Sequence, residues 1–278
     1  MKRQLKIAFC TCVQLGLSCI NAILSIGGKL DLLITLRDDL FKTKSGRIFL
    51  DEVANNNNIP LVKIKNINDE EIISIIKKEK IDWLFIIGWS QIAKKDILNA
   101  PKYGCIGMHP TLLPKGRGRA SIPWAILKGL DKTGVTMFKL DEGVDTGDII
   151  GQKEIYIKKD INATELYDLV NEAHIELIKS YWEDIVLNNI KLIKQNNNLA
   201  TEWPGRKPED GLIDKNMDVF YAERLVRAVT KPYPGAFIIN EDGSKTIIWS
   251  AHVSNKFEKE SIELKNGFLV LDQTEKVF

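Results

Sequence analysis

Apolar blocks alternate with amphipathic stretches along the first half of the chain. Four continuous apolar runs predict buried strands: 5–10, 30–36, 59–64 and 81–88. Three stretches between them have the spacing of helices that bury one face: 15–25, 45–55 and 69–79. Strands that are apolar on both faces and separated by helices predict an α/β domain with a parallel sheet covered on both sides. Ligands bind such sheets beyond the carboxyl ends of the strands.

The second half of the chain changes character after a polar segment. Asn162 and Glu165 have the spacing of a helix capping pattern and predict a long helix over 162–187. The asparagine run 196–198 marks a loop. Three short apolar runs separated by turns follow it and predict strands: 246–249, 261–265 and 268–271. We therefore divide the chain into a first domain, a linker and a small β-rich domain: 1–190, 191–204 and 205–278.

Composition narrows the class of protein. Of the 278 residues, 44% are hydrophobic and 27% are charged, which excludes a disordered chain. The formal charge of +2 gives no electrostatic reason to expect a nucleic acid or a membrane surface as partner. No apolar run approaches the roughly 20 residues of a membrane span, and the run 5–10 lacks a signal-peptide cleavage site.

The cysteines and glycines exclude two kinds of cofactor site. Three of the four cysteines crowd into one predicted strand–loop–helix, a poor layout for disulfides or a zinc site: Cys10, Cys12, Cys19 and Cys105. We expect reduced thiols, a cytoplasmic protein and no metal. The loop after the first strand holds only Gly16, whereas a dinucleotide-binding loop needs three spaced glycines, so we also exclude NAD and FAD.

Candidate chemistry is concentrated in residues 106–151. His109 lies in a loop-like Met-His-Pro context after the apolar Cys105-Ile106, and Pro110 and Pro114 restrict the backbone there. Asp145 lies in a second glycine-rich loop. An imidazole can take a proton from an attacking amine while a nearby carboxylate orients it and stabilises its charged form. The residues alone leave a second interpretation equally open, in which His109 caps a turn and Asp145 is solvated.

Motifs in both halves of the chain resemble those of the folate-dependent formyltransferases. That family includes methionyl-tRNA, glycinamide ribonucleotide and nucleotide-sugar N-formyltransferases. The similar segments are His109–Pro114, with Thr111 in the place of a serine, Arg117-Gly118, Pro123–Ile126, Asp145–Ile149, Arg206–Gly211, Leu225–Thr230 and Pro232–Phe237. The resemblance implies a Rossmann-like first domain, a C-terminal OB-like domain, and His109 and Asp145 as the catalytic pair.

One position departs from the family pattern. The family carries a catalytic asparagine two residues before the histidine, where it stabilises the oxyanion that develops on the formyl group, and here that residue is Gly107. Losing one such donor costs on the order of 10²–10³ in rate. A main-chain N–H, another donor or an ordered water could replace it. Alternatively, the chain is a catalytically silent folate- or nucleotide-binding protein.

The resemblance also implies the positions of the two substrates. N10-formyltetrahydrofolate, with no metal, is expected against Trp89, Ser90, Gln91, Leu140, Asp141, Glu142, Gly143 and Val144. Trp89 fits ordinary core packing equally well. The acceptor is expected near Gly107, Thr111, Lys115, Arg117 and Arg119, where forked guanidinium groups suit a phosphate. Solvated turns or internal ion pairs are the alternative for these cations, and for Arg117 the resemblance slightly favours a structural role, because the Arg-Gly pair is a feature of the whole family.

Charge helps to choose the acceptor. Residues 201–278 hold 11 Lys and Arg against 13 Asp and Glu, a charge of −2, whereas a tRNA-binding domain should be basic. We therefore expect a small-molecule acceptor, a nucleotide-linked amino sugar, and no nucleic-acid or membrane partner. Methionyl-tRNA formylation and formyltetrahydrofolate hydrolysis are the alternatives. A homodimer through the C-terminal strands is implied by the resemblance only.

Overall fold

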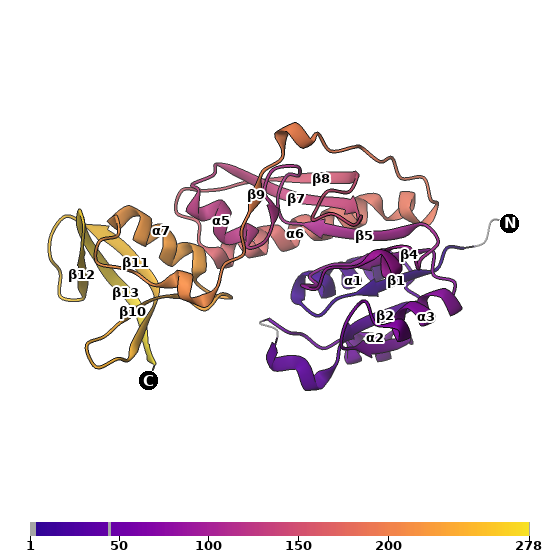
Figure 1. Cartoon of the computed structure of the whole chain (residues 1–278), viewed down its shortest axis with the longest axis horizontal. Helices are drawn as coiled ribbons and strands as arrows, with labels where there is room; N and C mark the ends of the chain where they lie inside the picture. Colours follow the sequence, from indigo (N-terminus) through magenta and orange to yellow (C-terminus); the bar gives the residue numbers. More distant parts are fainter. Residues whose placement is uncertain (1–3, 44–45, 278) are drawn as a thin grey trace. The chain divides into compact units, whose positions relative to one another are not determined.

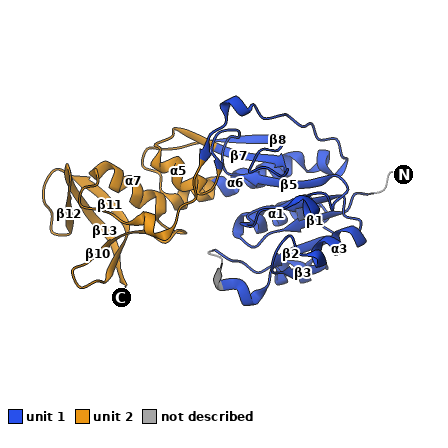
Figure 2. Ribbon diagram, viewed as in Figure 1, with its two compact units in different colours: residues 1–117, 134–155, 170–202 blue, residues 118–133, 156–169, 203–278 orange. Residues whose placement is uncertain are grey.

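The structure is a computed structural model that describes residues 4–43 and 46–277. The described chain forms two compact units, shown in blue and orange in Figure 2. The first comprises residues 1–117, 134–155 and 170–202, and the second comprises 118–133, 156–169 and 203–278. The units interleave along the chain, and the division into 1–190, 191–204 and 205–278 stays a prediction.

A seven-stranded sheet organises the first unit, in the order β3-β2-β1-β4-β5-β7-β8 (Figure 1). Its strands are β1 (Ile7–Cys10), β2 (Leu32–Leu36), β3 (Leu61–Ile64), β4 (Trp83–Ile86), β5 (Gly104–His109), β7 (Lys132–Lys139) and β8 (Ile149–Tyr156). The four pairs from β3 to β5 are parallel, which confirms the prediction for β1–β4, whereas β5 was not predicted as a strand. β7 pairs antiparallel with β5, so the sheet is mixed. An apolar run has the same pattern in either direction, so the sequence did not reveal this reversal.

Both faces of the central strands are covered. On one face Ala8, Cys10 and Leu84 belong to a buried cluster with Ile72 and Ile76 of α3 (Glu70–Lys78). On the other, Phe9 stacks on Phe85 at 5.4 Å, and Phe85 stacks on Trp182 at 6.3 Å between ring centroids. Trp182 lies on α6 (Ala163–Val186). The alternation of side chains along β1 and β4 therefore places an apolar layer on each side, which confirms the two-sided arrangement.

The remaining helices of this unit are α1 (Gln14–Ser25), α2 (Asp51–Asn56) and α4 (Lys95–Leu98). α6 begins as its sequence predicts. Asn162 Oδ1 accepts from the Glu165 backbone N–H, and Glu165 Oε2 accepts from the Asn162 backbone N–H, each at 3.0 Å. These reciprocal bonds satisfy N–H groups that the first turn cannot pair internally.

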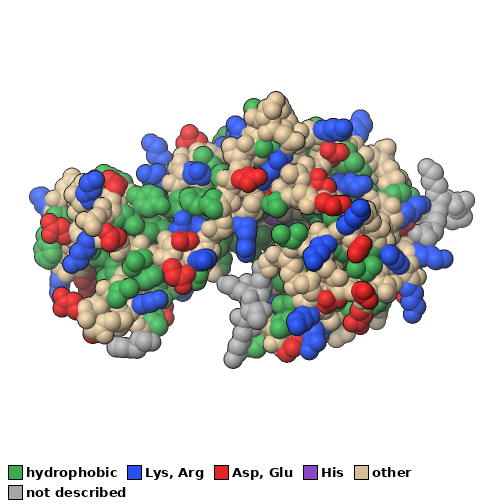
Figure 3. Space-filling view, in the orientation of Figure 1, with side chains coloured by type: hydrophobic (Ala, Val, Ile, Leu, Met, Phe, Trp, Pro, Cys, Tyr) green, Lys and Arg blue, Asp and Glu red, His purple; other side chains and the backbone are tan. Residues whose placement is uncertain are grey.

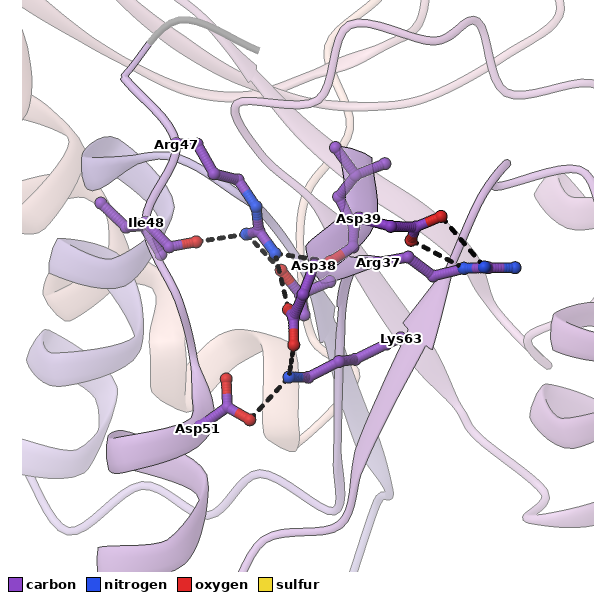
Figure 4. A network of polar contacts seen from close by, with 9 residues as sticks. Arg37, Asp38, Asp39, Arg47, Ile48, Asp51 and Lys63 are labelled. Atoms are coloured by element: carbon purple, nitrogen blue, oxygen red, sulfur yellow. Dashed lines mark hydrogen bonds and ion pairs between the residues drawn. The ribbon is translucent and has the colours of Figure 1, made fainter. Parts of the chain in front are cut away.

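The helix predicted over 45–55 is shorter than expected. Ser45 lies outside the described residues, and α2 starts only at Asp51. Arg47 instead forms a β-bridge with Val13, and its guanidinium donates to Thr35 Oγ1 at 2.8 Å and to the Leu36 carbonyl at 2.5 Å. Figure 4 shows this network continuing through Asp38 to Lys63. These contacts with residues distant in sequence outweigh the local helical spacing.

The second unit contains two helices and an antiparallel sheet. The helices are α5 (Ser121–Leu127) and α7 (Val219–Val229), the latter capped by the Asp218 carboxylate. The sheet has the order β10-β11-β13-β12, with β10 (Ala236–Ile239), β11 (Lys245–Ser254), β12 (Ser261–Leu264) and β13 (Gly267–Val277). The prediction of a C-terminal β-rich region is confirmed, although it missed β10 and underestimated the length of β11 and β13.

The four cysteines are all buried thiols. Burial raises the pKa of the thiols of Cys10, Cys19 and Cys105, which keeps them protonated and unreactive. Within residues 4–43 and 46–277, no group of three or more His, Cys, Asp or Glu side chains is arranged to hold a metal ion. No helix in the same residues is both long and apolar enough to cross a membrane.

Burial of one histidine predicts an acid sensitivity of the fold. His174 lies on α6, is 1% exposed and donates through Nδ1 to the Val170 carbonyl at 2.7 Å. Desolvation lowers the pKa of His174 from 6.5 to about 4. Between about pH 6.5 and pH 4, His174 is therefore protonated in the unfolded chain but neutral in the folded chain. The free energy of unfolding falls with pH over this range, by about 2 kcal/mol at pH 5.

We expect His174→Asn to remove that part of the pH dependence, because asparagine keeps a donor but does not titrate. Urea unfolding at pH 7 and pH 5 measures the difference. His252→Asn is the control, since the side chain of His252 is 54% exposed. An unchanged pH dependence in His174→Asn would contradict the assignment.

Candidate active site

His109 is the last residue of β5 and lies at the carboxyl edge of the sheet. Its side chain is 9% exposed, and its Nε2 donates to the Gly116 carbonyl at 2.8 Å. A carbonyl oxygen only accepts hydrogen bonds, so Nε2 carries a proton and Nδ1 is the nitrogen that can gain or lose one. The backbone fixes the ring from the same loop, because the Thr111 N–H donates to the His109 carbonyl at 2.9 Å.

Asp145 lies in the loop that joins β7 to β8. The Asp141 carboxylate organises this loop by accepting from the Gly143 N–H at 3.1 Å and from Thr146 Oγ1 at 2.6 Å. Gly147 has no room for a side chain, because a Cβ would lie 1.7 Å from the Lys139 carbonyl oxygen. Asp145 itself adopts the left-handed backbone region, with φ of 54°. A non-glycine residue in that conformation depends on its surroundings to hold it there.

The two loops bring the predicted pair together. His109 Nδ1 lies 3.5 Å from Asp145 Oδ2, and the Asp145 side chain is 18% exposed. Protonation of Nδ1 would place an imidazolium between two acceptors, the Gly116 carbonyl and the Asp145 carboxylate. The arrangement can therefore take up one proton at Nδ1 and stabilise the resulting charge.

Gly107 lies on β5, two residues before His109, and is buried. A Cβ at this position would lie 2.7 Å from Leu140 Cδ2 and 3.2 Å from Leu140 Cγ. Leu140 also packs with Leu113, Phe138 and Ile149. An apolar side chain thus crowds the space next to Gly107 in which a longer side chain would begin, and any donor for an oxyanion must come from elsewhere.

The residues predicted to contact folate divide into two kinds. The Gln91 amide joins two loops, since its Oε1 accepts from the Ile67 N–H at 2.9 Å and from Trp89 Nε1 at 3.1 Å, while its Nε2 donates to the Lys65 carbonyl at 2.9 Å. Trp89 is half-buried against the core, as its alternative interpretation expected. Exposed residues of the predicted set remain available to a ligand: Ser90, Asp141, Glu142, Gly143 and Val144.

The residues predicted to contact the acceptor are also placed differently from one another. Thr111 is 2% exposed, and its Oγ1 has no hydrogen-bond partner among the described residues. Lys115 is exposed in the loop after His109, and Arg119 is exposed in the second unit. Arg117 is 6% exposed. Its guanidinium donates to Gln195 Oε1 at 2.7 Å and to Asn197 Oδ1 at 2.8 Å, so the structure gives it internal partners.

Two residues of the predicted linker contact the candidate site and were not predicted. Gln195 Nε2 donates to the Asp145 carbonyl at 2.8 Å and to the Gly147 carbonyl at 2.7 Å. Thr201 Oγ1 accepts from the Gly116 N–H at 2.9 Å. In the sequence this segment has only the polar composition of a loop, and no pattern in it indicates which side chains turn towards the sheet.

Comparison with known proteins places these features in a family. A formyl transferase family model matches residues 35–180, and the model of the formyl transferase C-terminal domain matches residues 206–277. Methionyl-tRNA formyltransferase of Clostridioides difficile is 37% identical over 199 residues, 72% of this chain and 64% of the relative. The bifunctional polymyxin resistance protein ArnA of Wigglesworthia glossinidia brevipalpis is 34% identical over 243 residues, 86% of this chain but only 36% of the relative.

Solved structures share the fold at lower sequence identity. The sugar 3N-formyl transferase WlaRD superposes with a TM-score of 0.73 at 22% identity, over 99% of this chain and 98% of WlaRD. Methionyl-tRNA formyltransferase from Clostridium thermocellum superposes with a TM-score of 0.66 at 19% identity, over 98% and 99% of the two chains. The first family model alone matches more than half of the residues of this chain, and the chain therefore belongs to the formyl transferase family.

Proposed function

We propose that this protein transfers a formyl group from N10-formyltetrahydrofolate to the amine of a nucleotide-linked amino sugar. The observation that carries the proposal is the His109–Asp145 pair, 3.5 Å apart at the carboxyl edge of the sheet. Ligands of parallel sheets bind at this edge. The pair can accept a proton next to a bound substrate, and family membership identifies formyl transfer as the reaction that uses it.

His109 and Asp145 handle the proton in this reaction. The unprotonated amine attacks the formyl carbon, a new C–N bond forms, and the bond from that carbon to N10 breaks. The attacking nitrogen loses one proton and N10 of the departing tetrahydrofolate gains one. His109 Nδ1 takes the first proton, because Nε2 is already bonded to the Gly116 carbonyl. Asp145 stabilises the imidazolium until the proton moves on to N10.

The residues around the pair fit a folate co-substrate. The loop 141–144 is exposed, and Val144 within it is 53% exposed, so the loop offers both polar and apolar surface to a ligand. Ile92, in the loop after β4, is 69% exposed. The Thr111 hydroxyl is a buried group without a partner among the described residues, so a substrate polar group would satisfy it. WlaRD was crystallised with dTDP and 5-N-formyl-THF, and an N-formyltransferase from Helicobacter canadensis with folinic acid and dTDP-3-aminofucose.

The distribution of charge favours a small acceptor over tRNA. Residues 201–278 carry a charge of −2. On the face drawn in Figure 3, acidic and basic side chains are interspersed rather than gathered into one basic area. In the network of Figure 4, Lys63 is shared between Asp38 at 2.6 Å and Asp51 at 2.7 Å, and Arg37 pairs with Asp39 at 3.0 Å. The carboxylates beside Lys63 and Arg37 offset the positive charge of these two side chains.

Methionyl-tRNA formylation is the second candidate, because several relatives matched by sequence carry that name. The chain spans about a third to two thirds of the length of the first three relatives. Hydrolysis of formyltetrahydrofolate and folate binding without turnover are the other outcomes of the acceptor experiment below.

Removal of either catalytic group should abolish transfer without unfolding the protein. We expect His109→Ala and Asp145→Asn each to lower kcat by at least about 10²-fold. Asparagine suits the left-handed conformation of position 145 better than alanine, so it isolates the loss of charge. Formyl transfer measured by release of tetrahydrofolate tests the prediction, with circular dichroism as the folding control. Near-normal turnover in either variant would remove the mechanistic assignment.

Gly107 and Leu140 should be coupled. Gly107→Asn alone should cost about 1–3 kcal/mol of stability, because its Cβ overlaps Leu140 Cδ2. The double variant with Leu140→Ala makes room for the amide and should raise kcat above that of Leu140→Ala alone. Urea unfolding and tetrahydrofolate release provide the two measurements. If Gly107→Asn fails to raise kcat in the Leu140→Ala background, an asparagine at this position does not supply the oxyanion donor.

The acceptor is tested by comparing candidate acceptors in parallel reactions. We expect single-turnover release of tetrahydrofolate with a dTDP- or UDP-linked amino sugar and none with methionyl-tRNA at equal concentration. The matched non-amino sugar nucleotide is the control, because it can bind but cannot be formylated. Release without any acceptor would indicate a hydrolase, and folate binding without release under all conditions would indicate a silent protein.

A further inference from the structure

The segment 195–201 contacts both loops that carry the candidate catalytic pair. We call residues 140–148, between β7 and β8, the aspartate loop. Gln195 Nε2 donates to two of its carbonyl groups, those of Asp145 at 2.8 Å and Gly147 at 2.7 Å. The same amide accepts through Oε1 from Arg117 Nε at 3.2 Å and from Arg117 Nη2 at 2.7 Å. The half-buried Gln195 side chain therefore bonds through both the nitrogen and the oxygen of its amide. It joins the aspartate loop to Arg117, at the end of residues 110–117, which we call the histidine loop.

A second contact reaches the histidine itself. Thr201 Oγ1 accepts from the Gly116 N–H at 2.9 Å, and the Gly116 carbonyl accepts from His109 Nε2 at 2.8 Å. The backbone continues the connection, since the Arg117 N–H donates to the Thr201 carbonyl at 2.9 Å. The peptide group that orients His109 is thus held from the same segment that holds Asp145.

Neither catalytic loop fixes the distance between His109 and Asp145 by itself. Asp141 closes the aspartate loop internally, but those bonds do not reach His109. Asp145 has a φ of 54°, and the Gln195 amide donates to the carbonyl of that residue and to the Gly147 carbonyl two residues later. Displacement of a catalytic group by about 1 Å can cost on the order of 10² in rate.

We propose that Gln195 is a positioning residue, which holds Asp145 at the distance and angle that His109 requires, with Thr201 supporting the histidine side. This inference rests on the proposed function. It assigns Arg117 to the brace, by which we mean the hydrogen bonds made by the Gln195 amide, because the Arg117 guanidinium donates twice to Gln195 Oε1. The phosphate-binding role considered from sequence then falls to other cations.

Gln195→Glu tests the proposal with an almost isosteric change. The carboxylate keeps the acceptor for Arg117 but loses both donors, and it turns an oxygen towards the Asp145 and Gly147 carbonyls. We expect kcat to fall about tenfold or more, with KM for the folate changed less than threefold. Asn197→Asp is the matched control, because it makes the same amide-to-carboxylate change on the other acceptor of Arg117, and it should leave kcat within twofold.

A double variant separates positioning from a general loss of stability. If Gln195 acts through Asp145, then Gln195→Glu added to Asp145→Asn should cause no further loss in single-turnover rate. Losses that multiply would show that Gln195 acts independently of the carboxylate and would overturn the proposal. Thr201→Val, which removes only the acceptor for the Gly116 N–H, should lower kcat by a similar factor in an otherwise normal protein.

Hydrogen–deuterium exchange tests the brace without any substrate. Amides of residues 141–148 should exchange at least several-fold faster in Gln195→Glu than in wild type, and no faster in Asn197→Asp. If the wild-type protein transfers no formyl group to any amine, the proposed function fails while this measurement still tests the brace. If exchange of 141–148 is equal in the two variants, the positioning role is wrong whatever the activity.

Discussion

The contact between His109 and Asp145 is the interaction on which the proposed chemistry depends. The two residues are 36 positions apart in sequence: His109 ends β5, and Asp145 lies in the loop that follows the neighbouring antiparallel strand β7. β5 and β7 are neighbours in the sheet, and hydrogen bonds from within the first loop and from Gln195 outside the second hold the two residues. His109 is oriented by a backbone carbonyl, and Asp145 is held through carbonyls bound to Gln195. In the proposed reaction, the order of this pair therefore depends in part on Gln195.

Gly107 affects both the packing around β5 and the proposed chemistry. Its buried position on β5 is next to Leu140, an apolar side chain that also packs with the core below the aspartate loop. Because Gly107 has no side chain, the Leu140 side chain can pack directly against β5. This packing leaves no room for a polar side chain that would stabilise an oxyanion. In the proposed reaction, charge on His109, a backbone N–H or a bound water would then stabilise the oxyanion.

Much of the site could be predicted because its signals are local. The short motif around His109 and the glycine-rich loop around Asp145 were visible in the sequence, and so was the unusual Gly107. What each cation does was less predictable. Arg117 lies in a Gly-Arg-Gly-Arg sequence that suits a phosphate, yet it is buried and bound to two amides. Its partners come from a segment about 80 residues later, and no local pattern encodes such a pairing.

The sequence by itself determined the alternation of strands and helices, the apolar faces of α3 and the central strands, the cap of α6 and the β-rich C-terminal region. Each follows from spacing within a few residues, where periodicity and capping act. Only the tertiary structure decided the antiparallel direction of β7, the extended path of residues 46–50 and the approach of Gln195 and Thr201 to the catalytic loops. Those features depend on hydrogen bonds between residues far apart in the chain, whose energy exists only once the sheet has assembled.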